Sequence, residues 1–179
     1  RIIKRAGKKD RKLIGIAPGS VRNTKEWTAE YFIKLVKMVG SDDIYLFFIG
    51  GEQEHQLCQK IIEESENPAT ANLAGDLSIL ESAALIDKMD LMISNDSAPL
   101  HMANAVNTDV FAFFGPTVRK FGFFPYRKDD KIFEVDLSCR PCSLHGGKKC
   151  PLGHHKCMKL IKPEDVYQAI IAHLNIRPG

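Results

Sequence analysis

The sequence predicts an α/β protein with a Rossmann-like parallel sheet and helices on both faces. Short apolar segments alternate with amphipathic segments of helical length along most of the 179 residues. The apolar segments contain few polar side chains, as do strands that are covered on both faces. Polar turns follow five of these segments, so five loops are expected at the carboxyl edge of the sheet, where α/β proteins bind ligands.

The individual elements are predicted from periodicity and from helix start signals. Ser78, followed three residues later by Glu81, matches the capping box that begins a helix. Thr28 and Ser97 stand at expected N-cap positions, and Pro163 starts the last helix. Strands are expected at 13–17, 44–49, 71–73, 90–94, 110–114 and 132–135, and helices at 28–39, 53–64, 78–88, after Ser97 and at 163–174.

The basic residues are concentrated at the start of the chain. Residues 1–12 hold seven basic side chains against the single acid Asp10, although the net charge of the chain is only +3. A nucleic-acid-binding protein carries its basic residues over a folded face, so this run is interpreted as a lead-in or linker and no nucleic-acid partner is expected. Residues 13–179 are expected to form one domain that includes a cysteine-rich loop at 139–157 and the helix at 163–174.

Membrane-spanning and secretion patterns are not found in the sequence. No apolar run approaches the roughly 18 residues that a membrane-spanning helix needs, and no signal-peptide pattern opens the chain. The first residue is Arg1 rather than Met, so the sequence is expected to be part of a longer polypeptide.

A polar turn between a predicted strand and a predicted helix is the first candidate ligand site. It has the sequence Asn95-Asp96-Ser97-Ala98-Pro99, with Ser97 as N-cap and Pro99 in the first helical turn. Backbone N–H groups and the positive end of a helix dipole bind anions at such turns. The alternative is an ordinary capped connection between a strand and a helix.

Several common catalytic motifs are absent. No predicted strand is followed by G-x-G-x-x-G or by G-x-x-x-x-G-K-[ST], which removes most of the case for a dehydrogenase or an ATPase. The sequence also lacks H-E-x-x-H, G-x-S-x-G and a paired-carboxylate spacing. What remains is an α/β domain with a helix N-terminus suited to a phosphate and with a lysine in another loop.

Five groups of residues occur in order at the ends of the predicted strands and in the loops after them. They are Pro18-Gly19-Ser20 with Lys25-x-Trp27, Ile49-Gly50-Gly51-Glu52 with Glu54, Asn72-Leu73-Ala74-Gly75-x-Leu77 with Glu81, Ser94-Asn95-Asp96-Ser97-Ala98-Pro99-x-His101-x-Ala103-x-Ala105, and Phe113-Phe114-Gly115-Pro116-Thr117. Together they resemble glycosyltransferase family 9, the lipopolysaccharide heptosyltransferases, which have the GT-B fold. The resemblance covers residues 13–117, and the correct order of all five groups makes it specific.

The resemblance assigns roles to the residues of the polar turn and to two side chains in other loops. Lys25 matches the lysine that reaches the phosphates or the leaving group, and it is the expected catalytic residue of this chain. Asp96, Ser97 and Ala98 match the turn whose N–H groups hold the donor diphosphate. Ala98 replaces the usual glycine of the family, which narrows the room for a close backbone approach. Glu52 matches a glutamate near the nucleotide ribose or the sugar.

Further positions complete the expected donor-binding set. His101, one helical turn beyond the polar turn, matches a family histidine that either contacts the donor or packs behind the residues that do. Ser20 and Gly115 lie in matching loops, and Thr117 either contacts the ligand or caps the next segment. Trp27 is interpreted as a core residue, with a platform for the base as the alternative.

The resemblance implies the C-terminal half of a two-domain GT-B transferase. Such a half binds a nucleotide-diphosphate sugar of the ADP-heptose type, and the full enzyme transfers the sugar to a lipid-linked acceptor of the lipopolysaccharide inner core. The general base is expected on an aspartate of the N-terminal domain, so this chain alone is expected to be inactive. No cofactor is required. A cytoplasmic location at the inner face of the bacterial inner membrane is implied, with peripheral membrane association through the full-length protein.

Alternatives to this function remain open from the sequence. The chain is also compatible with a family member that uses another nucleotide sugar, because the motifs do not define the sugar. A nucleotide-sugar-binding domain without activity is a second alternative. A third is an interaction module in which the cysteine-rich loop is the functional part.

Four cysteines are clustered in the loop at 139–157. Cys139 and Cys142 form a C-x-x-C pair, and Cys150 and Cys157 follow at a spacing that differs from a second C-x-x-C pair. These four thiols are candidate ligands of a structural Zn²⁺ ion, and a disulfide or free thiols are the alternatives. Cys58 lies on a predicted helix and is interpreted as a core residue.

Overall fold

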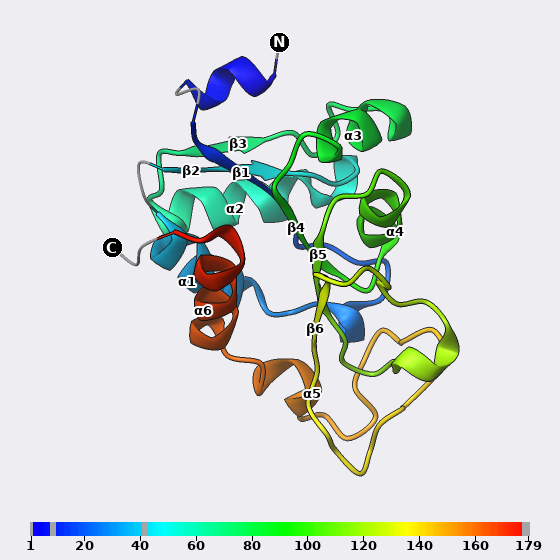
Figure 1. Ribbon diagram of the computed structural model, residues 1–179. Coiled ribbons are helices and arrows are strands. Elements are labelled where there is room, and N and C mark those ends of the chain that lie inside the picture. Colours follow the sequence, from blue (N-terminus) through cyan, green and yellow to red (C-terminus); the bar gives the residue numbers. More distant parts are fainter. Residues whose placement is uncertain (1, 8–9, 41–42, 177–179) are drawn as a thin grey trace.

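The computed structural model describes residues 2–7, 10–40 and 43–176. It contains a six-stranded sheet in which all paired strands are parallel, in the order β3-β2-β1-β4-β5-β6 (Figure 1). This confirms the predicted parallel α/β architecture. The strands are β1 (Lys12–Ala17), β2 (Ile44–Phe48), β3 (Thr70–Asn72), β4 (Leu91–Asn95), β5 (Val110–Phe113) and β6 (Lys131–Phe133).

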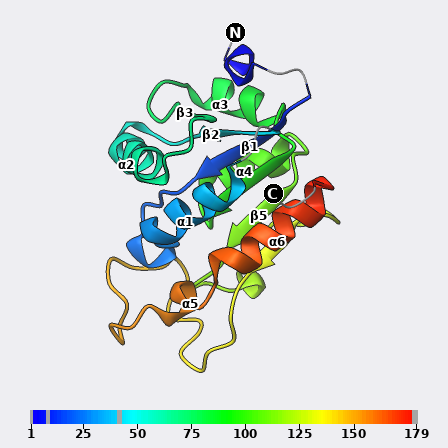
Figure 2. The same ribbon diagram turned by 90° about the vertical axis from the view of Figure 1, so that its left-hand side faces the viewer.

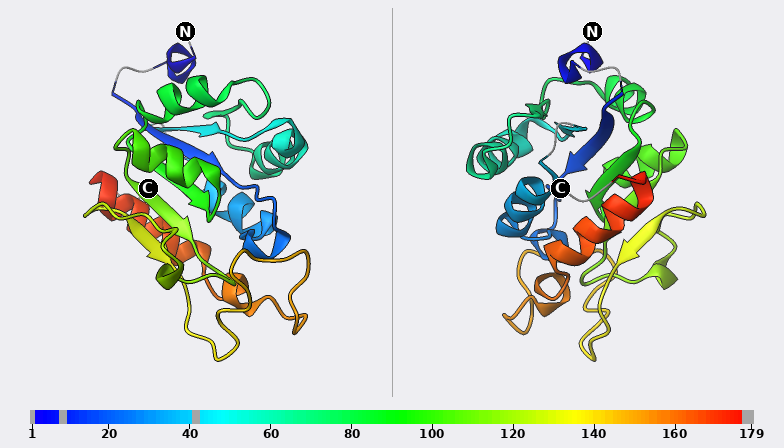
Figure 3. Two further views of the ribbon diagram at one scale, coloured as in Figure 1. Left: turned by 90° about the vertical axis from the view of Figure 1, so that its right-hand side faces the viewer. Right: turned by 60° about the vertical axis from the view of Figure 1, so that its left-hand side comes forward.

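Helices cover both faces of the sheet. On one face lie α1 (Ala29–Val39), α2 (His55–Ser65) and α6 (Pro163–Leu174), as Figure 2 shows. On the other face lie α3 (Ile79–Ile86) and α4 (Ala98–Ala105), which are in front in the left panel of Figure 3. The remaining short elements are the 3-10 helices η1 (Ile3–Ala6), η2 (Asn23–Lys25), η3 (Glu52–Glu54) and η4 (Arg119–Phe121), and helix α5 (Lys156–Lys159).

The amphipathic patterns place one apolar core on each face of the sheet. Helix α1 buries Phe32, Leu35 and Val36 against the sheet, which is the face that the spacing predicts. Leu100 and Ala103 of α4 are buried on the opposite face. Strands β2 and β5 are buried along their whole length, which explains why their sequences are almost entirely apolar. Within the described ranges, no helix combines the length and the apolar character needed to cross a membrane.

Helix α3 begins at the predicted capping box. The backbone N–H of Glu81 donates to the hydroxyl of Ser78 over 3.3 Å, and the Glu81 carboxylate accepts from the N–H of Ser78 at 2.9 Å. The helix ends at Ile86, two residues before the predicted end. Thr28 and Ser97 occupy N-cap positions as expected, but neither side chain makes the capping hydrogen bond.

Part of the predicted lead-in packs against the domain. Ala6, at the end of η1, is buried in the core on the side of α3 and α4. Strand β1 begins at Lys12, whose ammonium lies 3.0 Å from the carboxylate of Asp90. The fold therefore reaches into the segment 1–12, of which residues 1, 8 and 9 lie outside the described residues.

Candidate functional site

The strand order brings the loops after β1 and β4 together. The chain places β2 and β3 on one side of β1, and β4, β5 and β6 on the other. Ligands of open α/β sheets bind at the carboxyl ends of the strands where the order reverses in this way. In this chain that point lies between β1 and β4.

Asn95, the last residue of β4, joins the two loops. Its side chain is fully buried, and the side-chain oxygen Oδ1 accepts a hydrogen bond from the backbone N–H of Trp27 at 2.9 Å. The amide nitrogen of Asn95 donates to the backbone carbonyl of Pro18 at 2.7 Å. Because both partners belong to the loop after β1, one side chain fixes this loop against the end of β4.

A buried ion pair lies next to this junction. The ammonium of Lys25 lies 2.7 Å from the carboxylate of Asp96, and the Lys25 and Asp96 side chains are 15% and 5% exposed. The hydroxyl of Thr117, in the loop after β5, donates to the same carboxylate at 2.8 Å. Three loops thus bring together Lys25, Asp96 and Thr117, which are all predicted site residues.

The N-terminus of α4 is open toward the same side of the sheet. The hydroxyl of Ser97 lies 3.4 Å from the carbonyl of Asn95 instead of capping the helix. Pro99 has no N–H, and the N–H of Leu100 donates to the carbonyl of Ser97 at 3.2 Å. The described residues offer no acceptor to the N–H groups of Ser97 and Ala98, which lie at the positive end of the helix dipole.

Two cavities flank this helix N-terminus, and Ser97 and Ala98 line both. The first has a volume of about 270 Å³ and is lined largely by apolar groups, including Leu77, Pro99 and Met102. The second has a volume of about 390 Å³. It is lined by Lys25, Asp96, His101, Thr117, Phe121, Phe123, Leu144 and His145, among others.

The predicted residues are distributed unequally between these cavities. Ser20 lines the first cavity, and its backbone N–H donates to the carboxylate of Glu26 at 3.2 Å. Lys25 and Thr117 line the second cavity. His101 is exposed and also lines the second cavity. Burial raises the pKa of Glu26 more than the hydrogen bond from Ser20 lowers it.

Two predicted positions do not line either cavity. Glu52 is exposed in η3, while its neighbour Glu54 lines the first cavity and accepts a hydrogen bond from the N–H of Gly51 at 2.7 Å. Gly115 packs against Met158, and a Cβ at this position would lie 3.0 Å from the methionine side chain. Gly115 therefore serves the close packing of the loop after β5.

Trp27 is a core residue, which confirms the favoured interpretation. Its ring is 1% exposed and stacks on Phe113, with 4.3 Å between the ring centroids. The indole N–H donates to the backbone carbonyl of Ile161 at 3.0 Å. Cys58 is likewise fully buried, and burial raises the pKa of its thiol to about 12.

The clustered cysteines do not form a metal site. All five cysteines are free, and among the described residues no group of three or more His, Cys, Asp or Glu side chains is placed to hold a metal ion. The Zn²⁺ prediction for Cys139, Cys142, Cys150 and Cys157 therefore finds no preformed site. Burial raises the pKa of Cys142 and Cys157, whereas backbone N–H groups, that of His155 first, lower the pKa of Cys150.

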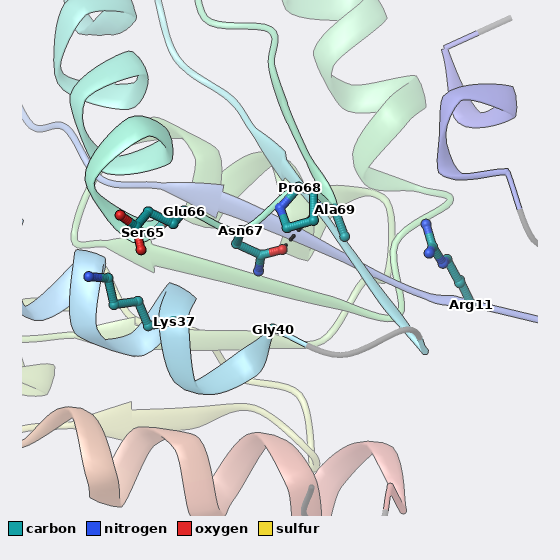
Figure 4. A pocket seen from close by; sticks show the side chains of 8 residues that line it. All are labelled: Arg11, Lys37, Gly40, Ser65, Glu66, Asn67, Pro68 and Ala69. Atoms are coloured by element: carbon teal, nitrogen blue, oxygen red, sulfur yellow. Dashed lines mark hydrogen bonds between the residues drawn. The ribbon is translucent and has the colours of Figure 1, made fainter.

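A further hollow lies at the opposite, amino edge of the sheet. Its volume is about 630 Å³, and it is lined by residues at the ends of α1 and α2 and before β1 and β3. Figure 4 shows Asn67 between Lys37 on one side and Arg11 on the other. None of the residues predicted for the site lines this groove.

Sequence reasoning missed several residues around the site. Asn95 belongs to the polar-turn motif, but its bridging role depends on the neighbouring strand. His145 and Leu144 line the second cavity from the cysteine-rich loop, and Arg140 contacts the loop that carries Thr117. Their positions among the cysteines carry no signal of this, because the path of the loop is a tertiary feature.

Comparisons with known proteins find relatives of similar sequence and fold. A lipooligosaccharide heptosyltransferase 2 of Campylobacter jejuni is 37% identical over 172 residues, which cover 93% of this chain and 51% of that protein. The structure of E. coli ADP-heptose lps heptosyltransferase II matches with a TM-score of 0.75 at 22% identity and covers 94% of this chain and 48% of that one. A glycosyl transferase family 9 structure from Veillonella parvula has a TM-score of 0.76 at 26% identity, with coverages of 94% and 48%.

The chain spans about half the length of the curated relatives it matches. Its Rossmann-like α/β fold is found in the heptosyltransferase structures. A family model described as glycosyltransferase family 9 (heptosyltransferase) matches residues 3–154, which is most of the sequence. This chain therefore belongs to glycosyltransferase family 9.

Proposed function

We propose that this chain is the donor-binding half of a glycosyltransferase and binds a nucleotide-diphosphate sugar of the ADP-heptose type. One observation carries the proposal. Two cavities meet at the open N-terminus of α4, and the buried pair of Lys25 and Asp96 lines the second of them. A donor with a flat aromatic base at one end, a sugar at the other and a diphosphate between them fits this arrangement.

Each part of the donor has a proposed place. The nucleoside occupies the first cavity, where Leu77 and Met102 supply apolar contacts. The diphosphate lies at the N–H groups of Ser97 and Ala98, and the sugar extends into the second cavity toward His101. Gln53 and Glu54 line the first cavity, so the polar contacts to the ribose are assigned to these two residues. The expected Glu52 directly precedes them in the chain.

The proposed chemistry is stabilisation of the leaving diphosphate. Negative charge develops on that group while the sugar becomes oxocarbenium-like, and fixed N–H dipoles together with an ammonium stabilise this charge. The Lys25 ammonium has three N–H donors, of which Asp96 takes two through its carboxylate at 2.7 Å and its backbone carbonyl at 3.4 Å. The third is available to a phosphate, and Asp96 holds the ammonium in place.

The acceptor and the general base are proposed to involve the other half of the enzyme. The acceptor hydroxyl belongs to a lipid-linked inner-core saccharide of lipopolysaccharide, and a base must remove its proton. An aspartate of an N-terminal domain is proposed for this role, with this chain as the C-terminal donor domain and the residues before β1, of which Ala6 packs into the core, as the connection. We place the enzyme at the cytoplasmic face of the inner membrane, with peripheral association through the full-length protein.

The proposed transfer uses no cofactor, because the N–H dipoles and Lys25 supply the positive charge that a divalent metal supplies elsewhere. A structural Zn²⁺ at the four clustered cysteines is a separate matter. Cys142, Cys150 and Cys157 line one small cavity, although no group of three or more ligands among the described residues is placed to hold a metal ion. Elemental analysis of freshly purified protein measures its zinc content directly.

Calorimetric titration of the chain tests the donor proposal. ADP-heptose and ADP are expected to bind, whereas AMP, which lacks the second phosphate, is expected to bind at least tenfold more weakly, a difference of about 1.4 kcal/mol. UDP-sugars serve as the comparison for the base. The chain alone is expected to show no turnover with a lipid-linked acceptor, and turnover would contradict the proposed division of the active site. Absence of any nucleotide binding would contradict the donor proposal itself.

A further inference from the structure

The cysteine-rich loop at 139–157 contacts two of the three loops that build the candidate site. It lies beyond the carboxyl edge of the sheet, as the left panel of Figure 3 shows in yellow and orange. On one side it is bonded to the loop after β5, which carries Thr117, through the N–H of Cys142 and the carbonyl of Pro116 at 3.0 Å. On the other side it is bonded to the segment that carries Lys25.

Arg140 makes the densest set of contacts in this loop. Its side chain is only 4% exposed. One guanidinium nitrogen donates to the backbone carbonyl of Thr117 at 2.9 Å and to that of Phe114 at 3.2 Å, and the Nε donates to the carbonyl of Gly115. The loop after β5 is therefore held at three of its carbonyls by one planar group.

The rest of the guanidinium is fixed on the β6 side. The Nη1 donates to the carbonyl of Val135, and the Nη2 lies 3.0 Å from the carboxylate of Glu134. Arginine alone among the side chains offers five N–H donors in a rigid plane, so it can satisfy this many acceptors at once. A lysine keeps the charge but reaches fewer of these carbonyls.

A second set of contacts holds the segment of Lys25. The N–H and the hydroxyl of Thr24 donate to the carbonyl of Gly147 at 3.1 and 3.0 Å, and the N–H of Gly147 donates back to the same hydroxyl at 2.7 Å. The Nε2 of His155 lies 2.9 Å from the carbonyl of Thr24. Thr24 directly precedes Lys25, so the same loop holds both the backbone next to Lys25 and the loop that carries Thr117.

We infer that Arg140 is a positioning residue for the donor site and acts through Thr117. By holding the carbonyls of the loop after β5, it sets the place of the Thr117 hydroxyl. That hydroxyl donates to Asp96 at 2.8 Å, and Asp96 in turn fixes the ammonium of Lys25 at 2.7 Å. The expected effect of Arg140 on donor affinity rests on the proposed function.

A double-mutant cycle in ADP affinity tests the inference. Arg140→Lys is expected to weaken ADP binding about tenfold, and Thr117→Val, which removes the hydroxyl and keeps the shape, by a similar factor. If Arg140 acts through Thr117, the double variant loses no more affinity than the weaker-binding single variant. The matched control is Arg119→Met, because Arg119 pairs with the same Glu134 at 2.9 Å but is 54% exposed. The control is expected to bind ADP as the unaltered chain does.

The outcomes separate positioning from simple stabilisation. A lower unfolding midpoint in Arg140→Lys with unchanged ADP affinity would overturn the inference, as would losses in the double variant that simply add. If the unaltered chain does not bind ADP, the proposed function is wrong. The hold of Arg140 on the loop after β5 is then tested separately by amide hydrogen exchange. Faster exchange at Thr117 and Val118 in Arg140→Lys than in Arg119→Met then supports the positioning of this loop by Arg140, and equal exchange in the two variants overturns it.

Discussion

The two edges of the sheet carry hollows of opposite character. The groove at the amino edge has about 630 Å³, more than either the 270 Å³ or the 390 Å³ cavity at the carboxyl edge. In the groove, the polar side chain of Asn67 bonds to the carbonyl of Val36 and to the N–H of Ala69. At the carboxyl edge, Asn95 and Asp96 instead join loops that are far apart in sequence. The smaller cavities thus lie where side-chain hydrogen bonds join separate loops of the chain.

Helix direction explains much of this difference. Helices α1 and α2 end at the groove, with Gly40 and Glu66 in the C-cap positions, so carbonyl groups face it. Helix α4 begins at the carboxyl edge, where N–H groups and the positive dipole end favour an anion. A phosphate is therefore expected at the carboxyl edge, and volume alone is a poor guide to the site.

The largest effect is expected from Lys25→Met. It leaves the buried Asp96 carboxylate without its cation, and the free energy of unfolding is expected to fall by about 3 kcal/mol. ADP affinity is expected to fall more than tenfold, about 1.4 kcal/mol. Lys37→Met in the groove is the control and should change neither quantity appreciably. Equal ADP affinity in the two variants, measured by calorimetry, would remove the distinction between the edges.

A second comparison uses the two bridging asparagines. Asn95→Ala and Asn67→Ala each leave a buried backbone N–H and a backbone carbonyl without a partner, and each is expected to cost about 2 kcal/mol in chemical unfolding. Only Asn95→Ala is expected to weaken ADP binding, because it releases the segment next to Lys25. Weakened ADP binding in Asn67→Ala would show that the groove and the site are coupled.

The capped N-terminus of α3 contrasts with the open one of α4. Ser78→Ala is expected to lower the free energy of unfolding by about 1 kcal/mol. Hydrogen bonds from Ser78 lower the pKa of Glu81 in the folded chain. The ionised Glu81 carboxylate therefore stabilises the fold above the ordinary pKa of glutamate, and this stabilisation is lost as the pH falls through the lowered pKa. Unfolding of Glu81→Gln at neutral and acidic pH is the measurement. A stability difference from the unaltered chain that grows as the pH falls would contradict this sign.

The smallest effect is expected from Ala98→Gly. Ala98 lines both cavities, and removal of its Cβ lets a phosphate approach the N–H groups more closely. ADP affinity is expected to rise about threefold, while the helix loses less than about 1 kcal/mol. Tighter binding sharpens the assignment of this turn to the diphosphate, and weaker binding would speak against it.

The sequence by itself determined the local elements of this protein. Period-2 and period-3.6 patterns depend on near neighbours, so the sequence alone predicts the buried strand β2 and the inward face of α1. The capping box of Ser78 and Glu81 is equally local. The residues at the strand ends, among them Lys25 and Asp96, could also be named, because parallel strands share one carboxyl edge.

Only the tertiary structure decided which of these residues meet. The order of the strands sets β4 beside β1, and this neighbourhood brings Lys25 to Asp96 and Asn95 to Trp27. It also decided that the cysteine-rich loop returns to the site, where Arg140 holds the loop of Thr117, and that Cys142, Cys150 and Cys157 line one cavity. Such contacts join residues that are far apart in the chain, and no local pattern in a single sequence records them.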